Sequence, residues 1–249
     1  MSLFIGNPKK LDDFKLVATR EFDDITKLVY LTEKMTKLPI TEIDGGKFFP
    51  CPNLTTREVH FVAGPSGSGK STYTNQYVLQ YLKLFPNRKV VVFSKFKNDV
   101  SCPYFGHPNV TIVPNSEVTE DFEDKFPNKL FKDSLVIFDD VDSIAVDYKV
   151  RIHTIMNRLL ESGRHANTSM IITGHNIYNY KETKYILNES THAVFFPHSN
   201  FFQIQNFLKR YIGMNTTQVR RIKDLPSRWV CLRKNYPTTI IHESGIYIL

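Results

Sequence analysis

The stretch Gly64-Pro65-Ser66-Gly67-Ser68-Gly69-Lys70-Ser71, followed by Thr72, decides the fold of this chain. It matches the phosphate-binding loop pattern G-x-x-x-x-G-K-[ST] at every fixed position. Backbone N–H groups of such a loop surround the phosphates of ATP, a role that we predict here for residues 64–72. In the same pattern Lys70 reaches the β- and γ-phosphates, and the Ser71 hydroxyl binds Mg²⁺. A turn that only joined two elements would need neither side chain.

The sequence on either side places this loop between a strand and a helix. Residues 58–63 form a short apolar run typical of a buried strand, and residues 72–85 carry apolar side chains at roughly 3.6-residue spacing before Pro86. A strand, a glycine-rich turn and a helix N-terminus together aim backbone N–H groups and a helix dipole at one point. An anion is stabilised there, so the context supports a nucleotide site.

Apolar runs alternate with helical patterns along most of the remaining chain. This alternation predicts an α/β fold with a mostly parallel central sheet and helices on both of its faces. The last two apolar runs flank a turn at residues 235–237 and predict a C-terminal β-hairpin. We expect strands at 89–94, 110–113, 134–138, 169–173, 192–196, 229–233 and 238–242, helices at 148–160 and 181–188, and a partly helical connection at 121–131.

Residues 1–55 carry no motif, and we interpret them as an N-terminal extension packed on the core. Within them we predict a strand at 14–18 and a helix at 23–35, capped by one of its first two aspartates. We expect residues 56–249 to form one ATPase domain that ends in a basic segment. No apolar run approaches the ~18 residues of a membrane span, which excludes a membrane protein from the expected classes.

The cysteine pattern indicates the redox setting of the protein, and the distribution of charge indicates which partners it could bind. Cys51, Cys102 and Cys231 are odd in number and lack C-x-x-C spacing, which argues against a disulfide framework or a zinc site and favours an intracellular setting. The net charge is +7, and residues 201–249 hold eight cations against two acids, which gives +6 of that total. Such a segment suits the phosphates of a polyanion, although a solvated surface would show the same pattern.

Asp139 and Asp140 follow the apolar run at 134–138. A carboxylate at the C-terminal end of a neighbouring parallel strand points toward the nucleotide phosphates, so we predict that Asp139 binds Mg²⁺. Asp140 lies beyond the strand end and could activate a water molecule for attack on the γ-phosphate. The pair therefore favours hydrolysis over transfer to another acceptor. With Asp142 it could instead form a solvated acidic turn.

Two further groups are needed around a γ-phosphate that is being hydrolysed. One senses the phosphate, and Thr173, His175 or Asn176 could do so because they follow the strand expected at 169–173. The other is an arginine that neutralises the charge growing in the transition state, for which Arg158 and Arg164 are candidates. Either arginine could instead complement the dipole of the preceding helix at its C-terminus.

These residues resemble the genome-packaging ATPases of large DNA viruses and virophages, the poxvirus-type branch of the FtsK–HerA group of DNA motors. The likeness covers about residues 56–200. It rests on the loop at 64–72, on 91–95, on 135–140 and on the stretch from Arg158 to His175. The cellular relatives usually carry a glutamine sensor and an Asp-Glu pair, where this chain has Thr173-Gly174-His175-Asn176 and Asp139-Asp140.

The resemblance implies a P-loop NTPase with a RecA/FtsK-like ASCE core that hydrolyses ATP to move double-stranded DNA into a preformed capsid. It implies a ring of five or six subunits with ATP bound between neighbours, so that Arg164 acts on the ATP of the adjacent subunit. It also implies a place in the virus factory of the host cytoplasm and, during packaging, at a capsid vertex or portal protein.

Three other functions fit parts of this pattern. A helicase or recombination motor would share the same site but act on single strands. A small-molecule kinase would share the loop but would need an acceptor pocket and would have to exclude the water that Asp140 favours. A transporter ATPase of the ABC type is disfavoured because no L-S-G-G-Q-like signature lies between Lys70 and Asp139.

Overall fold

The computed structural model describes residues 1–8, 12–34, 38–97, 102–119, 122, 131–179 and 183–249. The chain forms two compact units, one of residues 56–190 and one that joins residues 1–55 to residues 191–249. The predicted packing of an extension, residues 1–55, on a domain of residues 56–249 stays a prediction. Within the described ranges, no helix combines the length and the apolar character needed to cross a bilayer.

The sheet of the 56–190 unit carries the glycine-rich loop. Its strands lie in the order β6-β10-β9-β7-β8 and are all parallel. Because helices cover such a sheet on both faces, its strands are continuous apolar runs, as the sequence predicts. The strands are β6 (Val59–Ala63), β7 (Lys89–Ser94), β8 (Val110–Pro114), β9 (Ser134–Phe138) and β10 (Ser169–Gly174).

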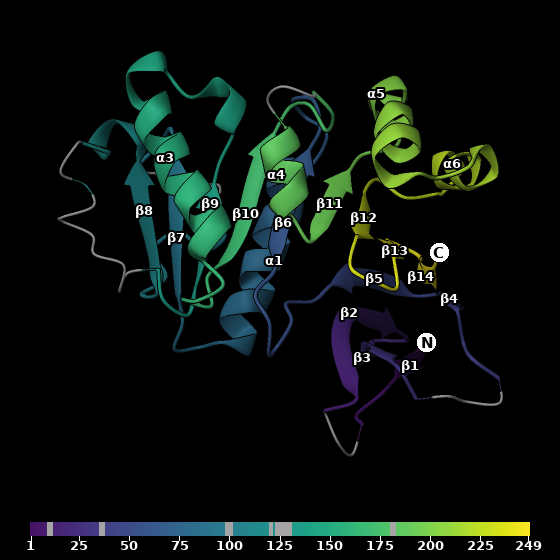
Figure 1. The fold of residues 1–249 in the computed structure, drawn as a ribbon. Helices are drawn as coiled ribbons and strands as arrows, with labels where there is room; N and C mark the ends of the chain where they lie inside the picture. The colour runs from purple at the N-terminus through teal and green to yellow at the C-terminus, as the bar shows by residue number, and fades with distance from the viewer. Residues whose placement is uncertain (9–11, 35–37, 98–101, 120–121, 123–130, 180–182) are drawn as a thin grey trace. The chain divides into compact units, whose positions relative to one another are not determined.

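Helices α1 (Lys70–Leu84) and α3 (Val146–Ser162) cover opposite faces of this sheet (Figure 1). The chain crosses the sheet in one direction from β6 to β7 and in the other from β9 to β10, so right-handed crossovers place the two helices on opposite sides. The shorter α4 (Lys184–Glu189) lies beside α3. Single 3₁₀ turns follow β8 at Asn115–Glu117 and β9 at Val141–Ser143. The connection predicted at 121–131 falls almost wholly outside the described residues.

The other unit begins with an antiparallel sheet in the order β1-β3-β2-β5. The helix predicted at 23–35 is wrong. Asp23 and Asp24 have φ angles of 49° and 57°, and they form the two-residue turn between β2 and β3. A two-residue turn of type I′ requires positive φ at both positions, which Asp tolerates, and pairing with β2 overrides the helical pattern. The strands are β1 (Ser2–Ile5), β2 (Phe14–Phe22), β3 (Ile25–Thr32) and β5 (Lys47–Pro50).

The C-terminal part of the same unit contains the predicted hairpin, which is confirmed: β12 (Val230–Arg233) pairs antiparallel with β13 (Thr239–His242). Two strands that the sequence analysis did not anticipate, β14 (Gly245–Ile248) and β4 (Glu42–Asp44), continue from β13, and β11 (His192–Phe195) pairs with β12. Between β11 and β12 the chain forms α5 (Phe201–Asn206), a π-helix (Phe207–Ile212) and α6 (Thr216–Lys223), so the first part of the basic segment is helical and the rest contains β12 to β14.

Candidate nucleotide-binding site

The loop at residues 64–69 leaves β6 and enters α1 at Lys70. Its first residue is fixed to β10, since the Gly64 N–H donates to the Gly174 carbonyl at 3.0 Å. Gly67 and Gly69 have φ angles of 76° and 113°, a region in which residues with side chains are strained. A Cβ on Gly67 would meet no described atom within 4 Å, so this side of the loop is open to a ligand.

Lys70 lies over the loop that precedes it. Its Nζ donates to the carbonyl of Gly64 at 2.7 Å and to that of Pro65 at 3.2 Å. Burial lowers the pKa of the Lys70 ammonium below its ordinary value, and the nearby carboxylates, Asp140 foremost, act in the opposite direction. The ammonium therefore lies within the electrostatic reach of the acidic pair.

Thr173 links the two predicted acidic residues. Its hydroxyl donates to Asp139 Oδ1 at 2.9 Å and accepts from the Asp140 N–H at 2.7 Å, and its side chain is buried. The link exists because β10 lies between β6 and β9, so its C-terminal end reaches both the loop and the acidic pair. The Thr173 hydroxyl donates its single proton to Asp139 and therefore has none left for a phosphate oxygen. We infer that Thr173 orients the acidic pair. Its role as the phosphate sensor stays a prediction.

His175 lies against the second acid. Its Nε2 is 2.9 Å from Asp140 Oδ1 and 3.3 Å from Ser143 Oγ, and its N–H donates to Asp142 Oδ2 at 2.5 Å. Asp140 has a φ of 52° and a ψ of 55°, a left-handed conformation that Asp tolerates better than most residues. The structure thus brings Asp140, Thr173 and His175 together, with Asp142 as a backbone anchor that the sequence analysis considered only as part of an acidic turn.

Gly174 leaves the space that the Asp142 carboxylate occupies next to the backbone. A Cβ at this position would lie 3.0 Å from Asp142 Oδ2 and 3.4 Å from a ring carbon of Phe61. A larger residue would force the Asp142 carboxylate or the Phe61 ring to move away from the backbone. The sequence contains a signal for this anchor, because a glycine follows Thr173 directly and a third aspartate follows the acidic pair. Only the pairing of the strands shows that Gly174 and Asp142 are in contact.

Arg158 and Arg164 are exposed and lie away from the acidic pair of their own chain. Strands β9 and β10 are parallel, so α3 returns the chain from the edge that holds Asp139 to the opposite edge, where β10 starts. At about 3.3 Å per residue, the six residues of β10 separate those edges by more than an arginine side chain can reach. Neither arginine can serve its own phosphate loop.

Arg57 is a third arginine at this far edge, which the sequence analysis missed. Its Nη2 donates to the Leu160 carbonyl at 3.2 Å, near the C-terminus of α3. Burial lowers the pKa of the Arg57 guanidinium, Glu189 opposes this shift and the charge of Arg164 adds to it. No motif includes Arg57, so only the fold shows that it lies near Arg164.

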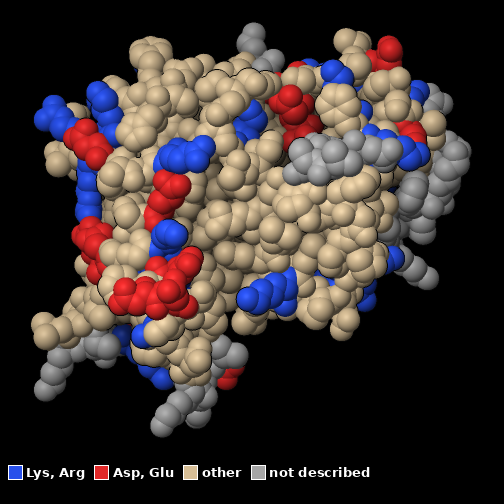
Figure 2. Space-filling model, turned by 180° about the vertical axis from the view of Figure 1, so that it is seen from behind, with Lys and Arg blue, Asp and Glu red and all other residues tan. Residues whose placement is uncertain are grey.

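The basic segment is not uniformly available to a polyanion. Arg233 is buried and donates to the carbonyls of Asn235 and Pro237 at 3.0 and 3.4 Å, and Arg221 pairs with Glu42. On the face shown in Figure 2, Lys and Arg alternate with Asp and Glu and do not gather in one field. The exposed cations of the segment, apart from Arg221, are Arg210, Arg220, Lys223 and Arg228.

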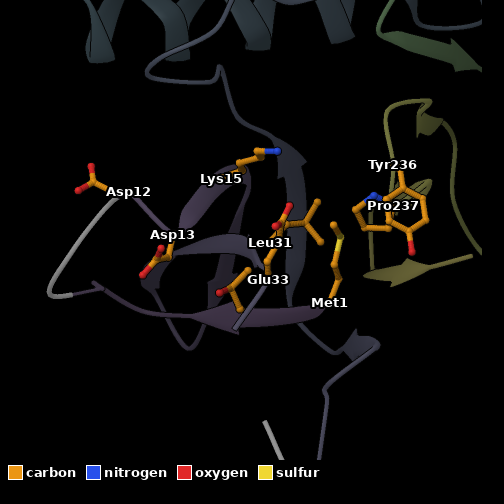
Figure 3. Close-up of a pocket in the computed structure, with 9 residues that line it drawn as sticks. Met1, Asp12, Asp13, Lys15, Leu31, Glu33, Tyr236 and Pro237 are labelled. Atoms are coloured by element: carbon orange, nitrogen blue, oxygen red, sulfur yellow. The ribbon is translucent and has the colours of Figure 1, made fainter. Parts of the chain in front are cut away.

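A pocket of about 170 Å³ lies in the unit without the phosphate loop (Figure 3). Tyr236 and Pro237 face Leu31 and Met1 across it, and acidic residues line its other side. One of these acids, Asp13, pairs with Lys34 at 2.9 Å. The pocket contains none of the residues that the motifs predict.

Comparison with known proteins identifies a relative that matches nearly the full length. The chain is 37% identical over 252 residues to the uncharacterized protein V3 of Sputnik virophage, and the match covers 98% of each protein. The chain belongs to the V3 family. No protein-family model matches the sequence.

Solved structures show the fold of this V3-family chain. The DNA-packaging ATPase B204 of Sulfolobus turreted icosahedral virus superposes with a TM-score of 0.52 at 16% identity, over 78% of this chain and 98% of B204. The conjugation coupling protein TcpA of pCW3, solved with ATPγS, superposes with a TM-score of 0.53 at 12% identity, over 93% of this chain and 77% of TcpA. The predicted α/β fold, which this chain shares with these structures, is therefore confirmed.

Proposed function

We propose that the protein is an ATPase that moves double-stranded DNA into a viral capsid. The observation that carries this proposal is the hydrogen-bonded link from Asp139 through Thr173 to Asp140, at the sheet edge that also holds the phosphate loop. A B204 packaging NTPase solved with ATPγS supports it, since it shares the fold at a TM-score of 0.52 and 14% identity. We place its action in the host cytoplasm, at a capsid vertex.

The residues present fit ATP and Mg²⁺. The open side of Gly67, the Lys70 ammonium and the N-terminus of α1 favour phosphate oxygens. Within the described part of the chain, the buried Ser68 hydroxyl has no hydrogen-bond partner, so a phosphate oxygen would satisfy it. Ser71 and Asp139 offer the oxygen ligands that Mg²⁺ prefers, and the bound ion would neutralise charge on the phosphates.

Asp140 is the proposed base. It follows the metal-ligand position directly, and its Oδ1 lies beside His175, which can hold the carboxylate in place or hydrogen-bond the attacking water. Lys70 would stabilise negative charge that grows on the γ-phosphate, since its ammonium is at the mouth of the loop. A base placed in this way favours water as the nucleophile, which is why we prefer a hydrolase to a kinase.

We further propose that the subunits form a ring in which one exposed arginine of the far edge, Arg164 or Arg158, acts on the ATP of a neighbour. Neither Arg158 nor Arg164 can reach the acidic pair of its own chain. Val146 and Val150, one helical turn apart on α3, are 84% and 74% exposed, which suits contact with another copy. The exposed arginines of the basic segment would contact DNA phosphates, which carry no sequence information.

The proposal predicts that duplex DNA accelerates ATP hydrolysis. Released phosphate should rise severalfold with added double-stranded DNA at low salt, and the gain should shrink as salt increases, because phosphate contacts release counterions. The Lys70→Ala variant should show neither basal nor stimulated turnover. Equal or greater stimulation by single strands would favour the helicase alternative, and a phosphorylated acceptor in place of free phosphate would favour the kinase.

A second prediction concerns Thr173. The Thr173→Val variant keeps the shape of the side chain but removes the hydroxyl that joins Asp139 to Asp140. We expect turnover to fall by about 10- to 100-fold, the usual cost of losing a group that orients metal ligands. Thr173→Ser keeps the hydroxyl and should remain close to wild type. Turnover measured against Mg²⁺ concentration checks this, and equal activity of both variants would contradict the positioning role.

A further inference from the structure

A second cavity lies beside the phosphate loop, in the 56–190 unit. It has a volume of about 90 Å³ and extends from Ser71 and Asp139 over the ends of β7, β8 and β9. None of residues 64–69 lines it, so it is separate from the phosphate cradle and shares with the proposed site only the two predicted metal ligands.

Thr74 gives this cavity an unused hydrogen-bonding group. The residue lines the cavity and is only 4% exposed, and within the described part of the chain its Oγ1 has no partner. A buried hydroxyl without a partner carries the cost of its lost hydrogen bonds to water. A ligand that supplied the missing hydrogen bond would remove that cost.

The remaining walls define the size and polarity of such a ligand. Val92, Ile112 and Ile137 lie at paired positions of three neighbouring strands and form an apolar wall, and Ser94 adds a polar residue to the lining. A volume of about 90 Å³ corresponds to roughly three water molecules, so only a fragment of a few non-hydrogen atoms fits.

We propose that this cavity is a small-molecule subsite that takes a neutral amide- or hydroxyl-bearing ligand. The polar group pairs with Thr74 and the carbon body packs on the apolar wall. Because the cavity reaches Ser71 and Asp139, an occupant crowds the proposed metal position and lowers ATP turnover. This effect on turnover rests on the proposed ATPase function; binding itself does not.

Cys102 makes the subsite testable, since it lines the cavity and is half-buried, whereas Cys51 and Cys231 are 3% and 0% exposed. The probe is iodoacetamide. The Cys102 thiolate attacks its methylene carbon, a C–S bond forms, the C–I bond breaks, and iodide leaves while the thiol proton goes to solvent. The product carries a neutral amide of the size that the cavity holds.

We expect iodoacetamide to label Cys102 faster than the other two cysteines in the folded protein, as read by peptide mass spectrometry. Thr74→Val should slow this labelling by roughly 2- to 12-fold, the contribution of one neutral hydrogen bond. Methyl methanethiosulfonate, which adds only a methylthio group as a mixed disulfide and releases methanesulfinate, should label both proteins at the same rate. The variant should unfold at a midpoint no lower than that of the parent, because no partner of the hydroxyl is lost and a buried unpaired polar group is removed.

Two results would overturn the subsite: equal iodoacetamide rates with and without the Thr74 hydroxyl, or labelling of Cys102 no faster than that of the buried cysteines. The labelling rates do not depend on turnover, so they stand even if the protein is not an ATPase. If it is, labelled protein should lose turnover and Cys102→Ser should resist the reagent. Full turnover after complete labelling would overturn the proposed crowding of the metal position.

Discussion

Asp140→Asn should lower ATP turnover by roughly 100- to 10,000-fold, the usual contribution of a positioned general base. Asparagine has the shape of aspartate but cannot accept a proton from water. It also tolerates the left-handed backbone that Asp140 adopts, with its φ of 52°. The variant should therefore fold as the parent does and bind a non-hydrolysable ATP analogue with similar affinity, and phosphate release would report the loss of the base alone.

Asp142→Asn is the matched control for this variant. It removes the same charge from the same turn, but an amide oxygen can still accept the hydrogen bond from the His175 N–H. We expect a far smaller loss of turnover than for Asp140→Asn. If the two variants lost turnover equally, the effect would come from the charge of the turn, and Asp140 would not be the base.

The phosphate loop and the acidic pair could be predicted because their chemistry is encoded in neighbouring residues. Gly67 and Gly69 supply the backbone angles, Lys70 supplies the ammonium, and the apolar strand before Asp139 fixes where the carboxylates emerge. Each signal lies within a few positions of the residue that it explains. The parallel sheet follows in the same way from continuous apolar runs that alternate with helices.

The contacts between these motifs could not be predicted, because they depend on the order of the strands. The insertion of β10 between β6 and β9 joins Thr173 to Asp139 and brings His175 against Asp140. Nothing in the local sequence distinguishes a threonine that bonds a carboxylate from one that senses a phosphate. The error at residues 23–35 has the same origin, since pairing between β2 and β3 outweighed the local helical pattern.

Arg164→Ala should lower ATP turnover by about 1,000-fold or more, the usual effect of removing an arginine that stabilises the transition state from a neighbouring subunit. The reason is geometric: Arg164 follows α3 at the sheet edge opposite Asp139, so in a ring it is available only to the adjacent site. Arg158→Ala is the matched control, because Arg158 lies in the last turns of the same helix and is also exposed. Whichever variant loses turnover identifies the acting arginine.

Mixing Arg164→Ala with Asp140→Asn subunits tests whether the action crosses the interface. Each variant alone lacks one part of every site, but an Arg164→Ala subunit followed by an Asp140→Asn subunit forms a site with both parts intact. In an equal mixture this order occurs with probability one half times one half, so about a quarter of the sites recover if they act independently in a ring of heterologous interfaces. Phosphate release should therefore rise well above that of either variant and peak near equal proportions. A flat response at every ratio would show that Arg164 does not complete a neighbour's site. Its effect would then have to come from its own chain, where its charge acts on Arg57.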